Sequence, residues 1–415
     1  MLAKVKCVVV GGGVIGNSIA RSLSLNGVEC ILCEANNILG EETTGRNSEV
    51  IHAGMYYAQN SLKSKFCVEG RAMLVDYLKT RKIEYDLCGK LIIANDAGEY
   101  EKLLHIEERS KINGVQGIEL LSSSDVAVME PNITCCNGAM LSSGTGIFDS
   151  HSYVNALNTE FESETVSQIG KSVPGNTVYN CAVEKIVENE VDVFGLDYSN
   201  THKYEVHTEQ GVLGCDVVIN AAGLGSISLA STVLPAAMIP NSYFCKGNYF
   251  KYQPVGAHTQ VRHLIYPIPP TAHTGLGVHL TLDLQGAIKF GPDVEWMEPA
   301  VHHDLNDKYS FGGSGGGGEY SHFSYAVDEG RAGSFYSAIR RYMPSLRDGE
   351  LVADYSGIRP KLCGPSYDPK SKTRTNGLDS SVNASATGTD TDISYDPADF
   401  YIQGSSVHGK RGLVN

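Results

Sequence analysis

The chain has 415 residues, of which 42% are hydrophobic and 19% are charged, a composition typical of a globular protein with two cores or one divided core. Its formal net charge of −14 at pH 7 argues against nucleic acid or an anionic membrane surface as a partner. No apolar run is long enough to be a transmembrane segment, and we expect no targeting sequence before the first strand. These features predict a cytoplasmic protein, or a mitochondrial one if a presequence is missing from this chain.

A strand, a helix and a second strand are predicted within the first 34 residues. Residues 4–10 form a β-branched run typical of a strand buried on both faces. Residues 14–26 place apolar side chains at near-helical spacing, and Gly27 ends that helix. Residues 29–34 form the second strand, which completes a βαβ unit.

The sequence "GGGVIG" follows the first strand and opens the helix. Its glycines permit a tight turn, a close approach of pyrophosphate and close helix–strand packing, while the helix N-terminus attracts phosphate. Glu34 ends the second strand, where a carboxylate can accept hydrogen bonds from ribose hydroxyls and disfavours a 2′-phosphate. We therefore expect an FAD or NAD site formed by Gly11, Gly13, Val14, Ile15, Gly16, Glu34 and Ala35.

The segment after the second strand favours FAD over NAD. It does not continue as another strand–helix repeat but as "GEETTGRNSEVIHAGMYY", a polar loop rich in Gly, Thr, Asn and Ser. Such a loop can wrap a long cofactor whose reactive ring lies far from its pyrophosphate. An NAD-dependent enzyme stays an alternative that fits the glycine motif but not this loop.

Further elements are predicted along the chain. Ser61 opens a helix, "GKLIIAN" is a strand, and residues 99–113 form a charged amphipathic helix. "HSYVNALNTEFE" and "GSFYSAIRRYMP" are predicted helices, and the sequence between them contains mainly strands and turns. Residues 312–318 have the composition of a flexible linker, and residues 366–397 that of a disordered insertion.

The eleven cysteines predict neither a metal site nor disulfides. Cys30 and Cys33 form a CxxC motif within the second strand, where residues three apart point to opposite faces. Cys135 and Cys136 are adjacent, a spacing that suits neither chelation nor a disulfide. Reduced, buried thiols are the expectation.

Several longer motifs follow in order between Val5 and Leu362, among them "RNSEVIHAGMYY", "CGKLIIA", "VINAAGL", "LIYPIP", "LGVHLT" and "GIRPKL". With them the sequence resembles FAD-dependent oxidoreductases of the D-amino-acid-oxidase type, and within that type the L-2-hydroxyglutarate dehydrogenase/oxidase group. The resemblance implies an α/β Rossmann-like FAD-binding domain and an α+β domain whose antiparallel sheet covers the flavin. It also implies an enzyme that binds FAD.

The resemblance further implies how the chain divides. The FAD-binding domain is expected to be discontinuous, and the substrate domain to fill the gaps. The expected FAD-binding segments are 1–85, 140–232 and 345–415, and the expected substrate or cap segments are 86–139 and 233–344. Residues expected along the FAD by the same resemblance are Thr44, Arg46, Asn47, Ser48, Val183, Ala222 and Gly223.

The resemblance is incomplete at the C-terminus. Members of the group continue past the equivalent of "GLVN" with a loop and a final helix that approaches the FAD, and residues 366–397 interrupt the path before it. We therefore expect a C-terminally truncated FAD-binding domain. A truncated, flavin-free and non-catalytic product is accordingly an alternative of another class.

Oxidation of a 2-hydroxy acid needs a cationic clamp for the carboxylate, a base for the hydroxyl proton and a C2 hydride directed at the flavin. His279 and His52 are the candidate bases, with His279 preferred, and Arg359 is the candidate clamp. A dicarboxylate needs a second cation or donor set, expected among Lys246, Arg262, Tyr57 and Tyr266. Together with His279 and Arg359, these form the expected substrate site.

The expected function is oxidation of L-2-hydroxyglutarate to 2-oxoglutarate by hydride transfer from C2 to FAD. The sequence leaves open whether a quinone or oxygen then accepts the electrons. An amine or amino-acid oxidase of the glycine- or sarcosine-oxidase type is the alternative enzyme, because the same flavin and arginine clamp would serve it.

Overall fold

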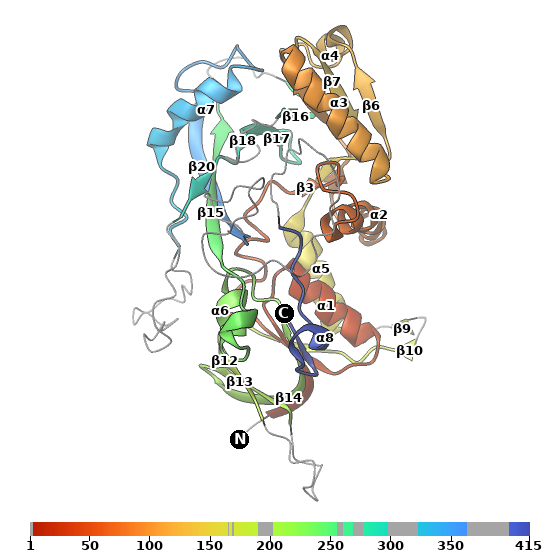
Figure 1. Ribbon diagram of the computed structural model, residues 1–415, viewed down its shortest axis with the longest axis vertical. Coiled ribbons are helices and arrows are strands. Elements are labelled where there is room, and N and C mark those ends of the chain that lie inside the picture. Colours follow the sequence, from red (N-terminus) through yellow and green to blue (C-terminus); the bar gives the residue numbers. More distant parts are fainter. Residues whose placement is uncertain are drawn as a thin grey trace, which may run out of the picture.

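The computed structural model describes residues 3–164, 166–167, 170–189, 202–254, 260–268, 277–297, 323–362 and 398–415. Within these ranges the chain forms two large sheets, one toward each end of the molecule's long axis (Figure 1). The linker at 312–318 and the insertion at 366–397 lie outside the described residues.

The sheet nearer the N-terminus has seven strands and a parallel centre. Strands β1, β2, β11, β14 and β21 run parallel, while β12 and β13 are antiparallel additions. This mixed sheet is the expected Rossmann-like arrangement. Its strands are β1 (Ala3–Val10), β2 (Cys30–Cys33), β11 (Asn176–Val178), β12 (Val183–Glu188), β13 (Tyr204–Thr208), β14 (Gly211–Asn220) and β21 (Leu413–Val414).

Helices cover both faces of this sheet, and residues 7–10 of β1 and 218–220 of β14 are buried between them. The helices α1 (Val14–Leu25) and α5 (Ser150–Glu162) pack on one face, and α6 (Ser226–Ser231) packs on the other. Cys30 belongs to the core on the α1 side and Cys33 to the core on the α6 side. The prediction that this CxxC motif points to opposite faces is therefore confirmed, and every described cysteine is a free thiol.

The second sheet has nine strands and is mainly antiparallel. Neighbours follow the order β19-β15-β18-β17-β16-β5-β7-β6, and β20 also pairs with β15. The strands are β5 (Lys90–Ala94), β6 (Ile118–Leu121), β7 (Gly138–Ser142), β15 (Tyr243–Tyr252), β16 (Leu264–Pro267), β17 (His279–Leu282), β18 (Ile288–Gly291), β19 (Glu295–Trp296) and β20 (Leu351–Lys361).

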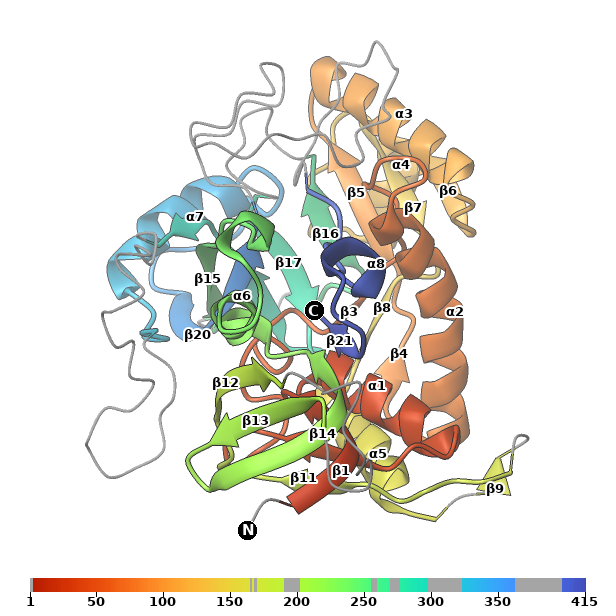
Figure 2. The same cartoon turned by 60° about the horizontal axis from the view of Figure 1, so that its bottom comes forward.

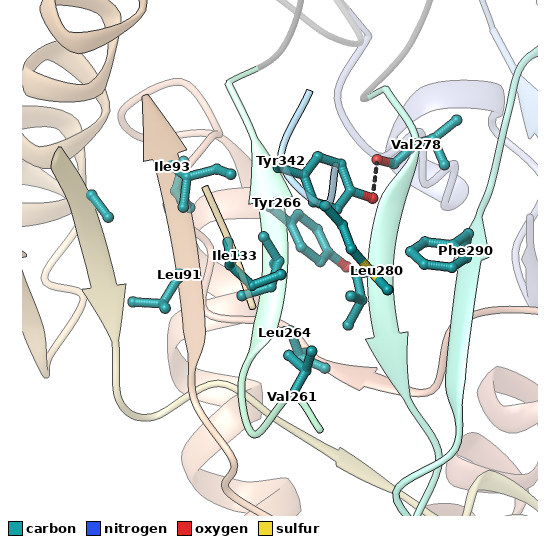
Figure 3. Packing of buried hydrophobic residues seen from close by; sticks show 14 of the residues in the cluster. Leu91, Ile93, Ile133, Val261, Leu264, Tyr266, Val278, Leu280, Phe290 and Tyr342 are labelled. Carbon is teal, nitrogen blue, oxygen red and sulfur yellow. Dashed lines mark hydrogen bonds between the residues drawn. The ribbon is translucent and has the colours of Figure 1, made fainter. Parts of the chain in front are cut away.

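Three helices cover the outer face of the nine-stranded sheet: α3 (Ala97–Ile112), α4 (Ser123–Met129) and α7 (Ala332–Ile339). Phe335 of α7 contacts Phe250 of β15 with ring centroids 4.6 Å apart. Tyr342 lies in the same core and donates a hydrogen bond to the carbonyl of Val278 at 3.2 Å (Figure 3). Because the helices occupy this face, the opposite face of the sheet is the one that can contact a ligand.

Smaller elements join the two sheets. The strands β3, β4 and β8 form a three-stranded sheet, and β9 pairs with β10. Ser61 accepts a hydrogen bond from the backbone of Ser64 and begins α2, as predicted. The bounds are β3 (Val50–Ile51), β4 (Tyr85–Asp86), β8 (Gly146–Phe148), β9 (Val166–Ser167), β10 (Gly170–Lys171), α2 (Leu62–Arg81), α8 (Ser405–His408) and the 3-10 turns Gly223–Gly225, Ala236–Met238 and Glu329–Arg331.

The C-terminal segment returns to the centre of the molecule (Figure 2). Asp399 accepts hydrogen bonds from the backbone N–H groups of Leu62 and Lys63 at the start of α2. The strand β21 then pairs with β14 of the seven-stranded sheet. In contrast, β20 joins the nine-stranded sheet, so the segment 345–415 contributes to both sheets and not only to the one expected for FAD.

Candidate functional site

The glycine loop closes the carboxyl ends of the parallel strands. Gly11 has φ of +102°, and a Cβ there would lie 2.4 Å from the carbonyl oxygen of Ala221, at the end of β14. A Cβ on Gly16 would lie 1.8 Å from the carbonyl oxygen of Gly11. Only glycine allows these three segments to meet, which is the geometry that lets a phosphate approach the backbone.

The N-terminus of α1 opens toward this loop. Its cap residue, Gly13, has no side chain to accept hydrogen bonds, and the first turn contains no acidic residue. The positive end of the helix dipole is therefore not compensated by its own first turn. Val14 and Ile15 form that turn, and Ile15 is exposed. A pyrophosphate fits this end of the helix electrostatically.

Glu34 is held beside the loop, with only 7% of its surface exposed. One carboxylate oxygen accepts the N–H of Gly12 at 2.7 Å, and the other accepts the N–H of Asn36 at 2.8 Å. Burial raises the pKa of Glu34, and these two hydrogen bonds act in the opposite direction. A carboxylate has about four lone-pair positions, so further acceptor capacity remains for ribose hydroxyls. Ala35 follows Glu34 directly in the chain.

The other segments that we expect to contact the cofactor lie beside Glu34 and the glycine loop. The backbone of Cys181 donates to the carbonyl of Glu34 at 2.8 Å, which brings the start of β12 at Val183 near the acid. Ala222 and Gly223 follow β14, and the Cα of Ala222 would lie 3.1 Å from a Cβ on Gly11. These positions fit residues that hold the adenosine and pyrophosphate parts of FAD.

The polar loop between β2 and β3 links the two large sheets. Thr44 Oγ1 accepts the N–H of Val14 at 3.1 Å, at the start of α1. Four residues later, Ser48 Oγ lies 2.9 Å from the hydroxyl of Tyr249 on β15. The loop therefore runs from the phosphate-binding end to the inner face of the nine-stranded sheet, the path that a long dinucleotide must follow to reach a substrate there.

Arg46 and Asn47 stiffen this loop. The Arg46 guanidinium lies over the ring of Tyr325 at 4.0 Å from its centroid. A Cβ on Gly357 of β20 would lie 1.9 Å from the Arg46 carbonyl oxygen, so the loop is pressed against that strand. Asn47 donates to the carbonyl of Thr44 at 2.6 Å. These contacts fix the loop against the nine-stranded sheet.

We expect Glu34→Gln to weaken FAD binding by about tenfold, because a neutral amide replaces a charged acceptor of two backbone N–H groups. The measurement is titration of the purified apoprotein with FAD, followed by flavin fluorescence. Glu29→Gln is the matched control, since Glu29 is exposed at the other end of the same strand. Equal affinities for both variants would contradict a role for Glu34 in cofactor binding.

The inner face of the nine-stranded sheet carries a row of aromatic rings. Tyr266 on β16 and His279 on β17 lie opposite each other, with ring centroids 3.6 Å apart and planes 13° apart. His279 is paired in turn with Gly291 on β18. A Cβ on Gly291 would lie 2.8 Å from the ring of Tyr249, so glycine allows the row to continue to β15. His279 is only 2% exposed.

Arg359 lies at the β20 side of this row. It pairs with Cys245 of β15, and its Nη2 donates to the Cys245 sulfur at 3.5 Å and to the carbonyl of Asp293 at 3.1 Å. Its positive charge opposes the rise in the pKa of Tyr249 caused mainly by burial, which indicates that the two side chains are close. The buried Nε has no hydrogen-bond partner among the residues that the structure describes. An unpaired guanidinium N–H is suited to a ligand carboxylate.

His52 lies at the other end of the site. Its Nδ1 accepts the N–H of Gly54 at 2.9 Å, and its ring stacks on Tyr57 with centroids 5.3 Å apart. Burial, with a smaller contribution from the charge of Lys90, lowers the pKa of His52 to about 3. The ring is therefore neutral with its proton on Nε2, so it can donate a hydrogen bond there but cannot accept a proton.

The structure brings together most of the substrate residues predicted from the sequence. Arg359, Tyr266 and His279 lie along one row. His52 stacks on Tyr57, and Lys90, which lies over the ring of Tyr266, is close enough for its charge to act on His52. Arg262 and Lys246 are the exceptions. Arg262 is exposed, away from the buried rings of the row. Lys246 alternates with Gly247 on β15, and its ammonium donates to the carbonyl of Ala326 at 2.5 Å. It faces away from the row because successive residues of a strand point to opposite faces.

Two residues of the site were missed by sequence reasoning. Tyr249 is an aromatic residue in an otherwise mixed strand, and nothing local distinguishes it. Lys90 did carry a signal, since it begins the otherwise apolar strand "KLIIA", in which all five residues are buried. A lysine fully buried in a strand is rare unless its charge has a partner.

The site has a glycine loop with its acid, and a second loop that runs from there to a row of buried rings beside an arginine. These features define a dinucleotide-dependent oxidoreductase. The sequence matches the family described as FAD dependent oxidoreductase over residues 6–382. The chain therefore belongs to this family, and it is an FAD-dependent enzyme, as predicted.

Curated relatives are similar over nearly the whole chain. The mitochondrial L-2-hydroxyglutarate dehydrogenase of Arabidopsis thaliana is 36% identical, over 99% of this chain and 79% of the relative. The mitochondrial L-2-hydroxyglutarate dehydrogenase of Homo sapiens is 33% identical, over 85% of this chain and 76% of the relative. The predicted resemblance to this group is confirmed.

Solved structures share the fold. The L-alpha-glycerophosphate oxidase from Mycoplasma pneumoniae with FAD bound aligns with a TM-score of 0.69 and 20% identity, over 87% of this chain and 84% of its own. The glycine oxidase from Geobacillus kaustophilus aligns with a TM-score of 0.64 and 16% identity, over 86% of this chain and 83% of its own. The predicted D-amino-acid-oxidase-like fold is confirmed. Among the described helices, none is both long and apolar enough to cross a bilayer.

Proposed function

We propose that this enzyme oxidises L-2-hydroxyglutarate to 2-oxoglutarate. The observation that carries the proposal is the row on the inner face of the nine-stranded sheet, where a buried histidine lies between an unpaired arginine N–H and a second cationic side chain. The identity of 36% to an L-2-hydroxyglutarate dehydrogenase supports the choice of substrate. The names of these relatives also support a mitochondrial location.

Each step of the reaction can be assigned to a residue of this chain. Arg359 binds the C1 carboxylate through its free Nε–H, which fixes C2 relative to the row. His279 accepts the proton of the C2 hydroxyl, and Nε2–H of His52 donates to a substrate oxygen. FAD, held by the glycine loop, Glu34 and residues 44–48, supplies the hydride acceptor for C2. The buried rings of Tyr249 and Tyr266 exclude water.

The test is anaerobic mixing of the FAD-loaded protein with L-2-hydroxyglutarate, glycine or sarcosine while the flavin absorbance is followed. We expect L-2-hydroxyglutarate alone to bleach the flavin. Bleaching by glycine or sarcosine instead would identify the enzyme as an amine oxidase. A protein that binds no FAD would favour the non-catalytic alternative. Repetition in air, with hydrogen peroxide measured, distinguishes oxygen from a quinone as the final acceptor.

A further inference from the structure

Lys90 is a buried cation, and no described residue offers it a counter-charge. It is 1% exposed, and its ammonium lies over the rings of Tyr266 and Tyr56, at 4.6 Å and 5.2 Å from their centroids. Across the described ranges, no hydrogen-bond acceptor and no carboxylate pairs with this ammonium. Cation–π contacts offset only part of the cost of removing an ammonium from water. Burial accordingly lowers the pKa of Lys90 to about 7.

The position of Lys90 connects it to the proposed reaction centre. The Lys90 ammonium and the His279 ring both contact the ring of Tyr266. A single aromatic ring therefore links the lysine to the histidine. Figure 3 shows Tyr266 on the strand between β5, which carries Leu91 and Ile93, and β17. Lys90 is the first residue of β5 and is in register with Leu264 of β16. Tyr266 lies two residues further along β16, on the same face of the sheet.

Lys90 and Arg359 lie on strands on either side of the histidine. Across the sheet, Lys90 belongs to β5, His279 to β17 and Arg359 to β20, in that order. A substrate whose reacting carbon lies at the histidine therefore has a cation on each side of it along the sheet. The other candidate cations do not compete, since Lys246 faces away and Arg262 is exposed.

We propose that Lys90 binds the second carboxylate of the substrate and thereby selects dicarboxylic over monocarboxylic 2-hydroxy acids. This inference rests on the proposed function, whose substrate class it specifies. A carboxylate at Lys90 completes an ion pair that no described residue provides, so the cost of burying the ammonium is offset when a dicarboxylate is bound.

The kinetic test uses Lys90→Met, which keeps the length of the side chain and removes its charge. Substrates are L-2-hydroxyglutarate and L-2-hydroxyvalerate, which has the same carbon chain but no second carboxylate. We expect KM for L-2-hydroxyglutarate to rise by about 10- to 100-fold, and KM for L-2-hydroxyvalerate to stay the same or fall. An unchanged ratio of kcat/KM for the two acids would overturn the inference. Lys251→Met, at an exposed position of the same sheet, is the control.

A binding test separates this inference from the proposed function. Glutarate and valerate are compared as ligands of the FAD-loaded wild type and of Lys90→Met by thermal shift. We expect glutarate to stabilise the wild type only, and valerate to stabilise neither. If glutarate binding depends on Lys90 but L-2-hydroxyglutarate does not bleach the flavin, the dicarboxylate site stands and the reaction is wrong. Equal glutarate shifts in both proteins, or none in either, would overturn the site.

The pH dependence of glutarate binding gives a second signature. Lys90 is charged below about pH 7, so glutarate affinity should fall as pH rises through that value, and bound glutarate should raise the pKa of Lys90. Within the described ranges, the titratable groups with an interaction with Lys90 are His52, Tyr56 and Tyr266, and His279 stacks on the ring of Tyr266. These groups are present in Lys90→Met as well, so the difference between the two profiles isolates Lys90. A profile for the wild type that matches the variant would contradict the inference.

Discussion

The substitution His279→Asn is expected to lower the rate of flavin reduction by about 10²- to 10⁴-fold, the usual contribution of a positioned general base. Asparagine can still donate and accept hydrogen bonds, but it cannot hold a proton near neutral pH. Because His279 is buried against Tyr266 and not at the glycine loop, FAD content should be unchanged. The measurement is the single-turnover rate of anaerobic flavin bleaching, with FAD content from the absorbance spectrum.

The control for this substitution is His52→Asn. The Nδ1 of His52 is occupied by the N–H of Gly54, so its proposed contribution is an N–H donor that an asparagine amide partly reproduces. We expect a rate loss of about tenfold. The loss in His279→Asn should therefore exceed the loss in His52→Asn, since only His279 accepts the hydroxyl proton. The reverse pattern would exchange the two roles.

The nucleotide end of the site was predictable because its determinants are local in sequence. Gly11 and Gly16 are required by contacts of their own backbone with Ala221 and with each other, and such constraints leave a fixed spacing in the chain. Glu34 follows from the length of the βαβ unit. The opposite orientations of Cys30 and Cys33 follow from the two-residue period of a strand.

The substrate end was less predictable because β5, β16, β17, β18, β15 and β20 build it from distant segments. Sequence motifs identified His279, Tyr266 and Arg359 through resemblance, but strand register decides which neighbours they meet. Lys246 and Gly247 differ by one position and face opposite ways, and only the structure distinguishes them. Lys90 was overlooked because an apolar strand predicts burial and says nothing of which ring or ligand its charge meets.

Domain boundaries show the same limitation. The resemblance assigned 345–415 to the FAD-binding domain, yet β20 forms a long antiparallel pair with β15 and presents Arg359 to the substrate row. Pairing with a strand more than a hundred residues away leaves no local signal in "GIRPKL". The division into two domains therefore stays a prediction, and the sheets alone define the architecture.

Arg359→Met is expected to lower kcat/KM for L-2-hydroxyglutarate by about 10²- to 10³-fold, mainly through KM, because it removes the donor for the C1 carboxylate. Arg359→Lys should recover only part of this loss, since an ammonium keeps the charge but not the planar arrangement of N–H donors. Steady-state kinetics and the dissociation constant of 2-oxoglutarate provide the measurement. L-2-hydroxyvalerate should lose activity to the same degree, unlike in Lys90→Met, because both acids share the C1 carboxylate.

A structural role for Arg359 predicts a different result. The guanidinium also donates to the Cys245 sulfur and to the Asp293 carbonyl, so it could merely hold β20 against β15. In that case Arg359→Met would lower the melting temperature and leave KM nearly unchanged. We expect the opposite, because the buried Nε has no partner in the described part of the chain and a bound carboxylate would supply one. Wild type should therefore gain more thermal stability from 2-oxoglutarate than Arg359→Met does.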